Sequence, residues 1–149
     1  MKRWFALLLL LSSCQSSTDL DHPPTFRFNY DACDYCRMLI TESRYAAALR
    51  LANGQARRFD DIGCLRHYLH EHPNESVVRI WVHDYLQERW LRAESAFYVQ
   101  SNRLTTPMGY GIVALADSTA AESLAQQLNV PLLRFEQLPA VSLSSFPQE

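Results

Sequence analysis

Tyr45-Ala46-Ala47-Ala48-Leu49-Arg50-Leu51 is the stretch that decides the fold, because this apolar run of strand length leads almost directly into Asn53-Gly54. An Asn-Gly pair between two candidate strands is a strong signal for a tight β-hairpin, since both residues accept the positive φ angles of such a turn. The hairpin predicts that Arg57-Arg58-Phe59 pairs back across the first strand. An antiparallel pair of strands therefore opens the folded part of the chain.

A helix follows the hairpin and leads to a third strand. Asp60 or Asp61 caps the start of the helix, and residues 70–74, which include a proline, end it. Its apolar side chains recur at helical spacing, at Ile62, Leu65 and Leu69. Residues 77–85 then predict a strand, because β-branched and aromatic residues dominate them.

The second half of the chain shows a similar order of elements. Asp117-Ser118-Thr119 opens its helix, and Thr119-Ala120-Ala121-Glu122 matches a capping box. A short strand is expected at 89–91, and the second ββαβ unit itself spans residues 96–135, with strands at 96–99, 111–116 and 132–135. We therefore predict an α+β protein made of two small ββαβ lobes, over about residues 31–88 and 89–138. Residues 139–149 are expected to form a frayed tail.

The amino terminus predicts export and a lipid anchor. Met1-Lys2-Arg3 is basic, and the apolar run Trp4–Leu11 is shorter than the roughly 20 residues that span a bilayer, as in a secretory signal peptide. Leu11-Ser12-Ser13-Cys14 resembles the lipobox of bacterial lipoproteins, which implies a signal peptide over 1–13 and acylation of Cys14. Residues 14–30 would then be a flexible tether on the periplasmic side of the membrane. Gln15 favours the outer membrane, by the same resemblance.

Composition excludes several classes of function. Removal of Lys2 and Arg3 with the leader changes the formal net charge from −2 to −4, which argues against nucleic acid as a partner. The sequence contains no Gly-rich phosphate loop, no Ser/His/Asp arrangement and no carboxylate pair that indicates hydrolysis. We therefore expect neither an enzyme nor a binder of small-molecule substrates.

Sulfur-bearing residues are the strongest functional signal in the chain. Cys33-Asp34-Tyr35-Cys36-Arg37-Met38 gathers two thiols and one thioether into six residues. Once Met1 is removed with the leader, Met38 and Met108 are the only methionines, and Met108 lies in the turn-like string Pro107-Met108-Gly109-Tyr110-Gly111. Thiolate and thioether together select Cu(I) over harder metal ions. The pattern predicts a Cu(I) site.

Three alternatives for Cys33 and Cys36 remain open at this point. The pair could form a structural disulfide, or act as a thioredoxin-like redox pair, which requires a helix directly after the motif. It could also bind zinc together with a second close pair of ligands from His67, His70 and His72. Two other features have simpler explanations: Cys64 as a small buried apolar residue and Asp60-Asp61 as helix caps.

Several short motifs, in this order, resemble the NosL family, the lipoprotein accessory factors of nitrous oxide reductase. They are the lipobox at Cys14, residues 35–38, Phe59-Asp60-Asp61-Ile62-Gly63-Cys64, residues 81–85, residues 96–99 and residues 107–111. The resemblance implies two ββαβ lobes and a periplasmic Cu(I) chaperone, with Cys36 and Met108 as ligands. Arg37 stands where the family usually has Gly, and Cys33, which not all members carry, leaves open whether one thiolate or two bind the metal.

These observations lead to one functional hypothesis and one alternative. The hypothesis is a membrane-tethered Cu(I) chaperone with Cys36 and Met108 as main ligands and Cys33 and Met38 in support. Its partners would be a copper-dependent reductase, by resemblance nitrous oxide reductase, and the machinery that assembles it. The alternative is a periplasmic thiol–disulfide oxidoreductase that uses Cys33 and Cys36.

Overall fold

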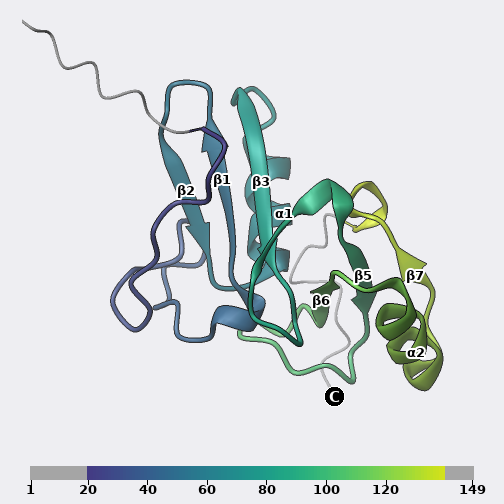
Figure 1. Cartoon of the computed structure of the whole chain (residues 1–149). Helices are drawn as coiled ribbons and strands as arrows, with labels where there is room; N and C mark the ends of the chain where they lie inside the picture. The colour runs from purple at the N-terminus through teal and green to yellow at the C-terminus, as the bar shows by residue number, and fades with distance from the viewer. Residues whose placement is uncertain (1–19, 140–149) are drawn as a thin grey trace, which may run out of the picture.

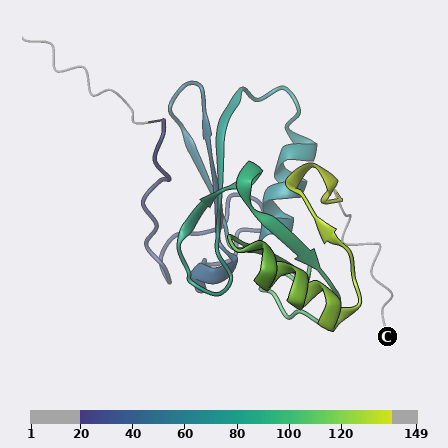
Figure 2. The ribbon, with the colours of Figure 1, turned by 45° about the vertical axis from the view of Figure 1, so that its right-hand side comes forward.

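The computed structural model describes residues 20–139, which fold as two antiparallel sheets with one helix packed on each (Figures 1 and 2). The predicted signal peptide, Cys14 and all but the first residue of the predicted tail lie outside the described residues. In chain order the elements are β1 Ala47–Leu51, β2 Ala56–Phe59, α1 Ile62–Glu71, β3 Val77–His83, β4 Trp90–Arg92, β5 Phe97–Gln100, β6 Ile112–Leu115, α2 Ser118–Leu128 and β7 Leu132–Leu133. Short 3-10 turns, η1 Ser43–Tyr45, η2 Ala93–Ser95 and η3 Phe135–Gln137, connect or end them.

The first sheet has the strand order β2-β1-β3-β4 and is antiparallel throughout. The predicted hairpin is confirmed: Ala47 pairs with Phe59, and Gly54 has a φ of 85° in the connecting turn. Strand β4 pairs with β3. The sheet that begins in the first lobe therefore extends past the expected boundary between residues 88 and 89.

The second sheet has the order β6-β5-β7 and carries α2 on one side (Figure 2). Two local predictions were wrong here. Asp117, rather than Thr119, caps α2, because its Oδ1 accepts the backbone N–H of Ala120 at 2.7 Å. The last strand ends at Leu133, because the chain turns into η3 immediately afterwards. The predicted α+β class, with a ββαβ order in each half, is confirmed.

A shared apolar core holds the two sheets together. The larger core cluster includes Leu49 and Phe59 from the first sheet, and Tyr98 and Ile112 from the second. Helix α1 contacts β1 and β2 as well as β6, so it lies between the two sheets. A direct link supplements this packing, since Tyr85 donates its N–H to the carbonyl of Ala114 at 2.8 Å. The amino end of α1 is therefore next to both halves of the molecule.

Residues 21–28, which the sequence assigns to the tether, lie against the first sheet in the structure. Phe26 packs on Trp90 with ring centroids 5.1 Å apart, and the Arg58 side chain donates to the Thr25 carbonyl at 2.8 Å. Asp21 forms an ion pair with Arg79 at 3.1 Å. The packed part of the chain therefore begins well before residue 31.

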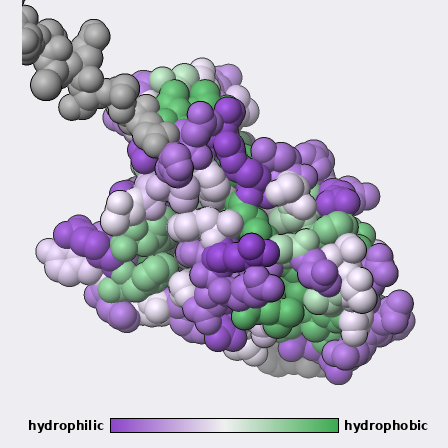
Figure 3. All heavy atoms as spheres, viewed as in Figure 1, coloured by the Kyte–Doolittle hydropathy of each residue, from purple (hydrophilic) through white to green (hydrophobic). Residues whose placement is uncertain are grey.

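The surface shows no simple division into polar and apolar halves. On the face in Figure 3, hydrophobic residues form several separate areas between hydrophilic ones. Among residues 20–139, no helix combines the length and the apolar character needed to cross a membrane.

Candidate metal centre

The loop before η1 holds two of the cysteines in a closed turn. Cys33 donates its N–H to the Met38 carbonyl at 2.8 Å, and Arg37 donates its N–H to the Cys33 carbonyl at 3.1 Å. Arg37 completes this turn with a φ of 69°, a left-handed conformation that glycine adopts at less cost. Asp34 ties the turn to β2, since it exchanges two hydrogen bonds with Arg58.

Helix α1 supplies the third cysteine. Asp61 is its N-cap, and the Asp61 Oδ1 accepts the N–H of Gly63 at 2.8 Å. The extended backbone of Asp61 turns directly into the helix, so Asp60 and Cys64 lie on either side of this start. Cys64 occupies the first turn and is fully buried, with Asp60 2% exposed. The end of β2 and the start of α1 thus bring a carboxylate and a thiol to the loop of Cys33 and Cys36.

Cys33, Cys36, Asp60 and Cys64 form one group, which we call the thiol cluster. Their ligand atoms all lie within 4.8 Å of one another. Both Oδ atoms of Asp60 are 3.4 Å from the Cys36 Sγ. All three cysteines are free; Cys33 and Cys64 are fully buried, whereas Cys36 is half-buried and gives the cluster its opening toward solvent.

The electrostatics of the thiol cluster favour neutral thiols at Cys36 and Cys64. Burial raises the pKa of the Cys36 thiol to about 12, and negative charge on the adjacent Cys33 would raise it further. The hydrogen bond with Cys33 raises the pKa of Cys64, and burial raises it further. The same hydrogen bond lowers the pKa of Cys33, because the Cys64 thiol donates to its sulfur. A bound cation would reverse this balance, since metal ligation requires thiolates and releases their protons.

A turn from the second half of the chain docks on the start of α1 and carries Met108. We call residues 106–111 the Met108 turn. The Asp61 Oδ2 accepts the hydroxyl of Thr106 at 2.6 Å and the N–H of Met108 at 3.1 Å. Met108 is half-buried and packs against the core cluster that contains Cys33 and Cys64. The turn therefore holds Met108 against the start of α1, the helix that carries Cys64.

Gly63 makes this docking possible. A Cβ at position 63 would lie only 2.0 Å from the Cγ of Tyr110. The Tyr110 ring, which is 1% exposed, thus occupies the space that any other residue at position 63 would need. It also packs against His67, with ring centroids 5.1 Å apart.

The structure brings together some of the residues that the sequence predicted and separates others. Cys33 and Cys36 lie in the thiol cluster, whereas Met108 lies in the turn that binds Asp61, the residue after Asp60. Met38 is 60% exposed, although its backbone belongs to the same turn. His67 stacks on Tyr35 rather than joining the thiols, with ring centroids 5.4 Å apart. Within residues 20–139, the detected metal-ligand group contains no histidine.

Sequence reasoning missed Cys64 and Asp60 as members of the site. Cys64 is buried, as expected, but its burial is against two other thiols. Asp61 alone is the helix cap, so capping does not explain Asp60. The available signal was their spacing of four residues across a strand-to-helix junction, together with the three cysteines, an odd number, that remain when Cys14 is acylated. The Cys33–Cys36 motif is followed by a turn and an isolated bridge, not by the helix that a thioredoxin-like pair requires.

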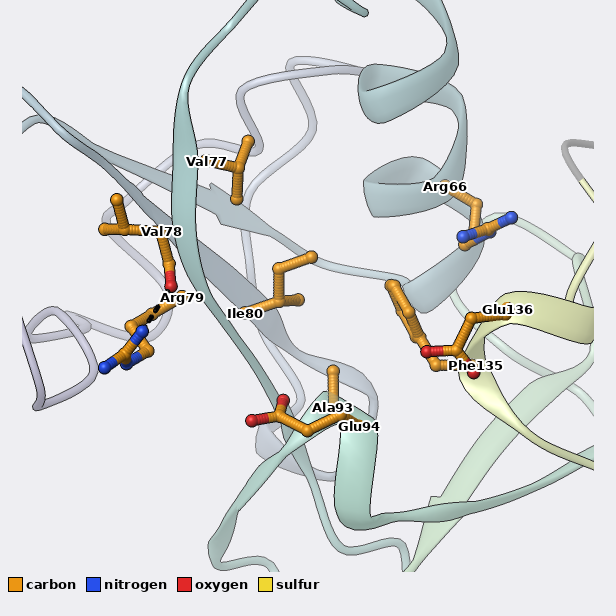
Figure 4. A pocket seen from close by; sticks show the side chains of 9 residues that line it. All are labelled: Arg66, Val77, Val78, Arg79, Ile80, Ala93, Glu94, Phe135 and Glu136. Carbon is orange, nitrogen blue, oxygen red and sulfur yellow. Dashed lines mark hydrogen bonds between the residues drawn. The ribbon is translucent and has the colours of Figure 1, made fainter.

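A separate pocket of about 590 Å³ lies elsewhere, between α1, β3, η2 and η3 (Figure 4). Apolar side chains such as Ile80 and Phe135 line it, with Arg66, Glu94 and Glu136 among its charged residues. No cysteine or methionine contributes to this pocket. It is therefore distinct from the thiol cluster.

Comparison with known proteins identifies the family. The NosL family model matches residues 28–143. A solved structure, the crystal structure of the copper chaperone NosL from Shewanella denitrificans, is 22% identical, with a TM-score of 0.68. The match covers 78% of this chain and 96% of that one, and it shows a shared fold. Comparison with curated protein sequences gave no match. Because the family model covers the thiol cluster, the Met108 turn and both sheets, this chain belongs to the NosL family.

Proposed function

We propose that this protein binds Cu(I) and delivers it for the assembly of a copper enzyme, without catalysing a reaction itself. One observation carries the proposal: three free thiols and a buried carboxylate have ligand atoms within 4.8 Å of one another. The turn that carries Met108 binds to Asp61, the residue that follows Asp60 of this group. Soft thiolate and thioether sulfur favours Cu(I) over Zn(II) and harder ions. The copper chaperone with the same fold supports this assignment.

Cys36 would be the principal thiolate, because it is the half-buried member of the thiol cluster and can be reached by a partner. Met108 would supply the thioether from the second half of the chain, and Cys33 a second thiolate. Cys64 and Asp60 join this set in our proposal, since both face the same sulfur atoms. Met38, 60% exposed, would support the site by contacting the metal at the entrance during its transfer, without holding it in the loaded state.

Delivery needs a metal site whose ligands a partner protein can replace one at a time. Cys36 and Met108 come from different halves of the chain, and both are only half-buried. A receiving protein could therefore displace one ligand while the other holds the metal. We propose nitrous oxide reductase and its assembly machinery as the receiving system. We also propose that acylated Cys14 anchors the chain on the periplasmic side of a bacterial membrane, with the outer membrane favoured by Gln15.

Cu(I) affinity, measured under anaerobic conditions by competition with a chromogenic chelator, tests the binding site. We expect about one Cu(I) per chain, a large loss of affinity in Cys36→Ser and a smaller loss in Met108→Leu. The matched variant Met38→Leu removes the exposed thioether, and we expect it to change affinity by no more than about twofold, or about 0.4 kcal/mol. Equal retention of Zn(II) and Cu(I) would contradict the copper assignment.

Two further assays test the fate of the metal and the location of the chain. The loaded protein should transfer Cu(I) to apo nitrous oxide reductase and show no disulfide-exchange activity. Exchange activity without copper binding would instead support the oxidoreductase alternative. Cys14→Ser should release the protein from the membrane fraction of a bacterial host, and wild-type protein in the soluble periplasmic fraction would exclude the anchor.

A further inference from the structure

We propose that Asp61 is a positioning residue, which holds the Met108 turn against the thiol cluster and so brings the thioether into the metal site. The inference rests on the proposed function. Asp61 is fully buried, and its carboxylate accepts three hydrogen bonds. One comes from Gly63 in α1, and two come from the Met108 turn. The carboxylate thus does more than cap a helix.

The internal bonding of the Met108 turn leads to this carboxylate. Thr106 accepts the N–H of Gly111 on its hydroxyl at 3.1 Å and the N–H of Gly109 on its carbonyl at 3.0 Å. The same Thr106 hydroxyl donates to Asp61 at 2.6 Å. Gly109 and Gly111 have φ values of 74° and 63°, so the backbone folds tightly around Met108. Loss of the Asp61 acceptor would therefore release both Thr106 and Met108, while the buried Tyr110 would still hold the far end of the turn.

Asp60 and Asp61 set the separation between the two sides of the metal site. Their Cα atoms are about 3.8 Å apart because a trans peptide joins them. Asp61 has extended backbone, with φ −144° and ψ 141°, and successive side chains point in opposite directions along extended chain. Asp60 accordingly contacts the Cys36 thiol, whereas Asp61 contacts the Met108 N–H. The dipeptide therefore fixes where the thioether turn lies relative to the principal thiol.

Asp61→Asn is the variant that separates positioning from capping. Its Oδ1 can still accept the Gly63 N–H, so the helix cap survives. Its amide nitrogen, facing Thr106 and Met108, cannot accept the Met108 N–H that the carboxylate oxygen accepts. Asp117→Asn is the matched control, because Asp117 caps α2 with one oxygen at 2.7 Å from the Ala120 nitrogen and lies outside the metal site.

Cu(I) affinity should be measured for these variants in the wild-type background and in a Met108→Leu background. We expect Asp61→Asn to lower affinity about tenfold, in the range found when residues that orient metal ligands are changed. The loss should disappear when Met108 is already Leu, because no thioether remains to be positioned. Asp117→Asn should bind as wild type does. An equal loss in both backgrounds, or no loss, would overturn the positioning role.

A second measurement does not depend on copper. With methyl-labelled methionine, the mature chain should give signals from Met38 and Met108. Asp61→Asn should shift or broaden the Met108 methyl signal in the metal-free protein and leave that of Met38 in place. Thr106→Val, which removes only the donated hydroxyl, should act in the same direction if Asp61→Asn proves too unstable to study. An unchanged Met108 signal in both variants overturns the inference, whereas wild-type protein that binds no Cu(I) overturns the proposed function instead.

Discussion

Gly63→Ala should destabilise this protein, although the same substitution stabilises most helices. Gly63 lies in the first turn of α1, where alanine would favour the helix by about 1 kcal/mol. Its new Cβ, however, would lie 2.0, 2.1 and 2.5 Å from three atoms at the base of the Tyr110 side chain. These atoms cannot swing aside as the end of a flexible side chain can, so the buried ring and its turn must move.

The magnitude follows from these two opposing effects. Overpacking a well-packed core costs about 1–3 kcal/mol, and contacts as short as these place Gly63→Ala at the upper end. Subtracting the gain in helix propensity leaves a net loss of about 2 kcal/mol. For a domain of this size, that loss corresponds to a decrease in Tm of about 8 °C. Because Tyr110 belongs to the Met108 turn, Cu(I) affinity should fall as well.

Urea denaturation of four proteins tests the reasoning: the wild type, Gly63→Ala, the Tyr110 variant and the double variant. In a Tyr110→Gly background all three of these atoms are absent, so Gly63→Ala should become neutral or slightly stabilising as helix propensity takes over. This change of sign separates the steric effect from any effect on the helix itself. If Gly63→Ala is as stable as wild type, or equally harmful in both backgrounds, contact with the Tyr110 ring does not determine the residue at position 63.

Three other predictions concern stability. Arg37→Gly should raise the urea midpoint. The left-handed backbone costs Arg37 about 1–2 kcal/mol, which glycine would not pay, and the greater conformational entropy of glycine in the unfolded chain offsets only part of this gain in stability. Burial lowers the pKa of His83 from 6.5 to about 4, so the unfolded chain binds a proton more readily than the folded one. The contribution of neutral His83 to the free energy of unfolding should therefore be fully present above about pH 6.5 and decline toward pH 4. Denaturation curves measured across this range should show a shallower decline for His83→Leu. Tyr98→Phe should cost about 1–2 kcal/mol in the same assay, since its buried hydroxyl donates to the Ala93 carbonyl at 2.7 Å.

Local patterns were sufficient to predict most of the fold. The Asn53-Gly54 turn fixed the hairpin, because its geometry depends on those residues and their immediate neighbours. Asp61 was one of two candidates for the cap of α1, and the structure selects it. The end of the last strand was harder to predict. Leu132 and Leu133 are strand-like, but continuation past them depends on a neighbour to pair with, and the chain turns into η3 instead.

The composition of the metal site depended on contacts that no local pattern reveals. Cys64 appeared to be an ordinary buried residue of a helix, and its burial was predicted correctly. The residues that surround Cys64 could not be predicted, because they depend on how the loop of Cys33 and Cys36 lies across the start of α1. The role of Asp60 was equally ambiguous, because it precedes Asp61, the residue that caps the helix. The exposed position of Met38 was also unexpected, since a strand would have placed its side chain on the same face as Cys36.

The distance along the chain between the site's parts has a consequence for folding. Cys36 and Asp60 are 24 residues apart, and Asp61 and Met108 are 47 apart. An unfolded chain keeps only sequence neighbours close together, such as Cys33 with Cys36 and Asp60 with Cys64, so it lacks the full set of donors. Any ion that binds the complete set therefore stabilises the native state by mass action, and thermal unfolding should occur at a higher temperature as ligand concentration rises. Metal occupancy would thus also protect the chain against unfolding.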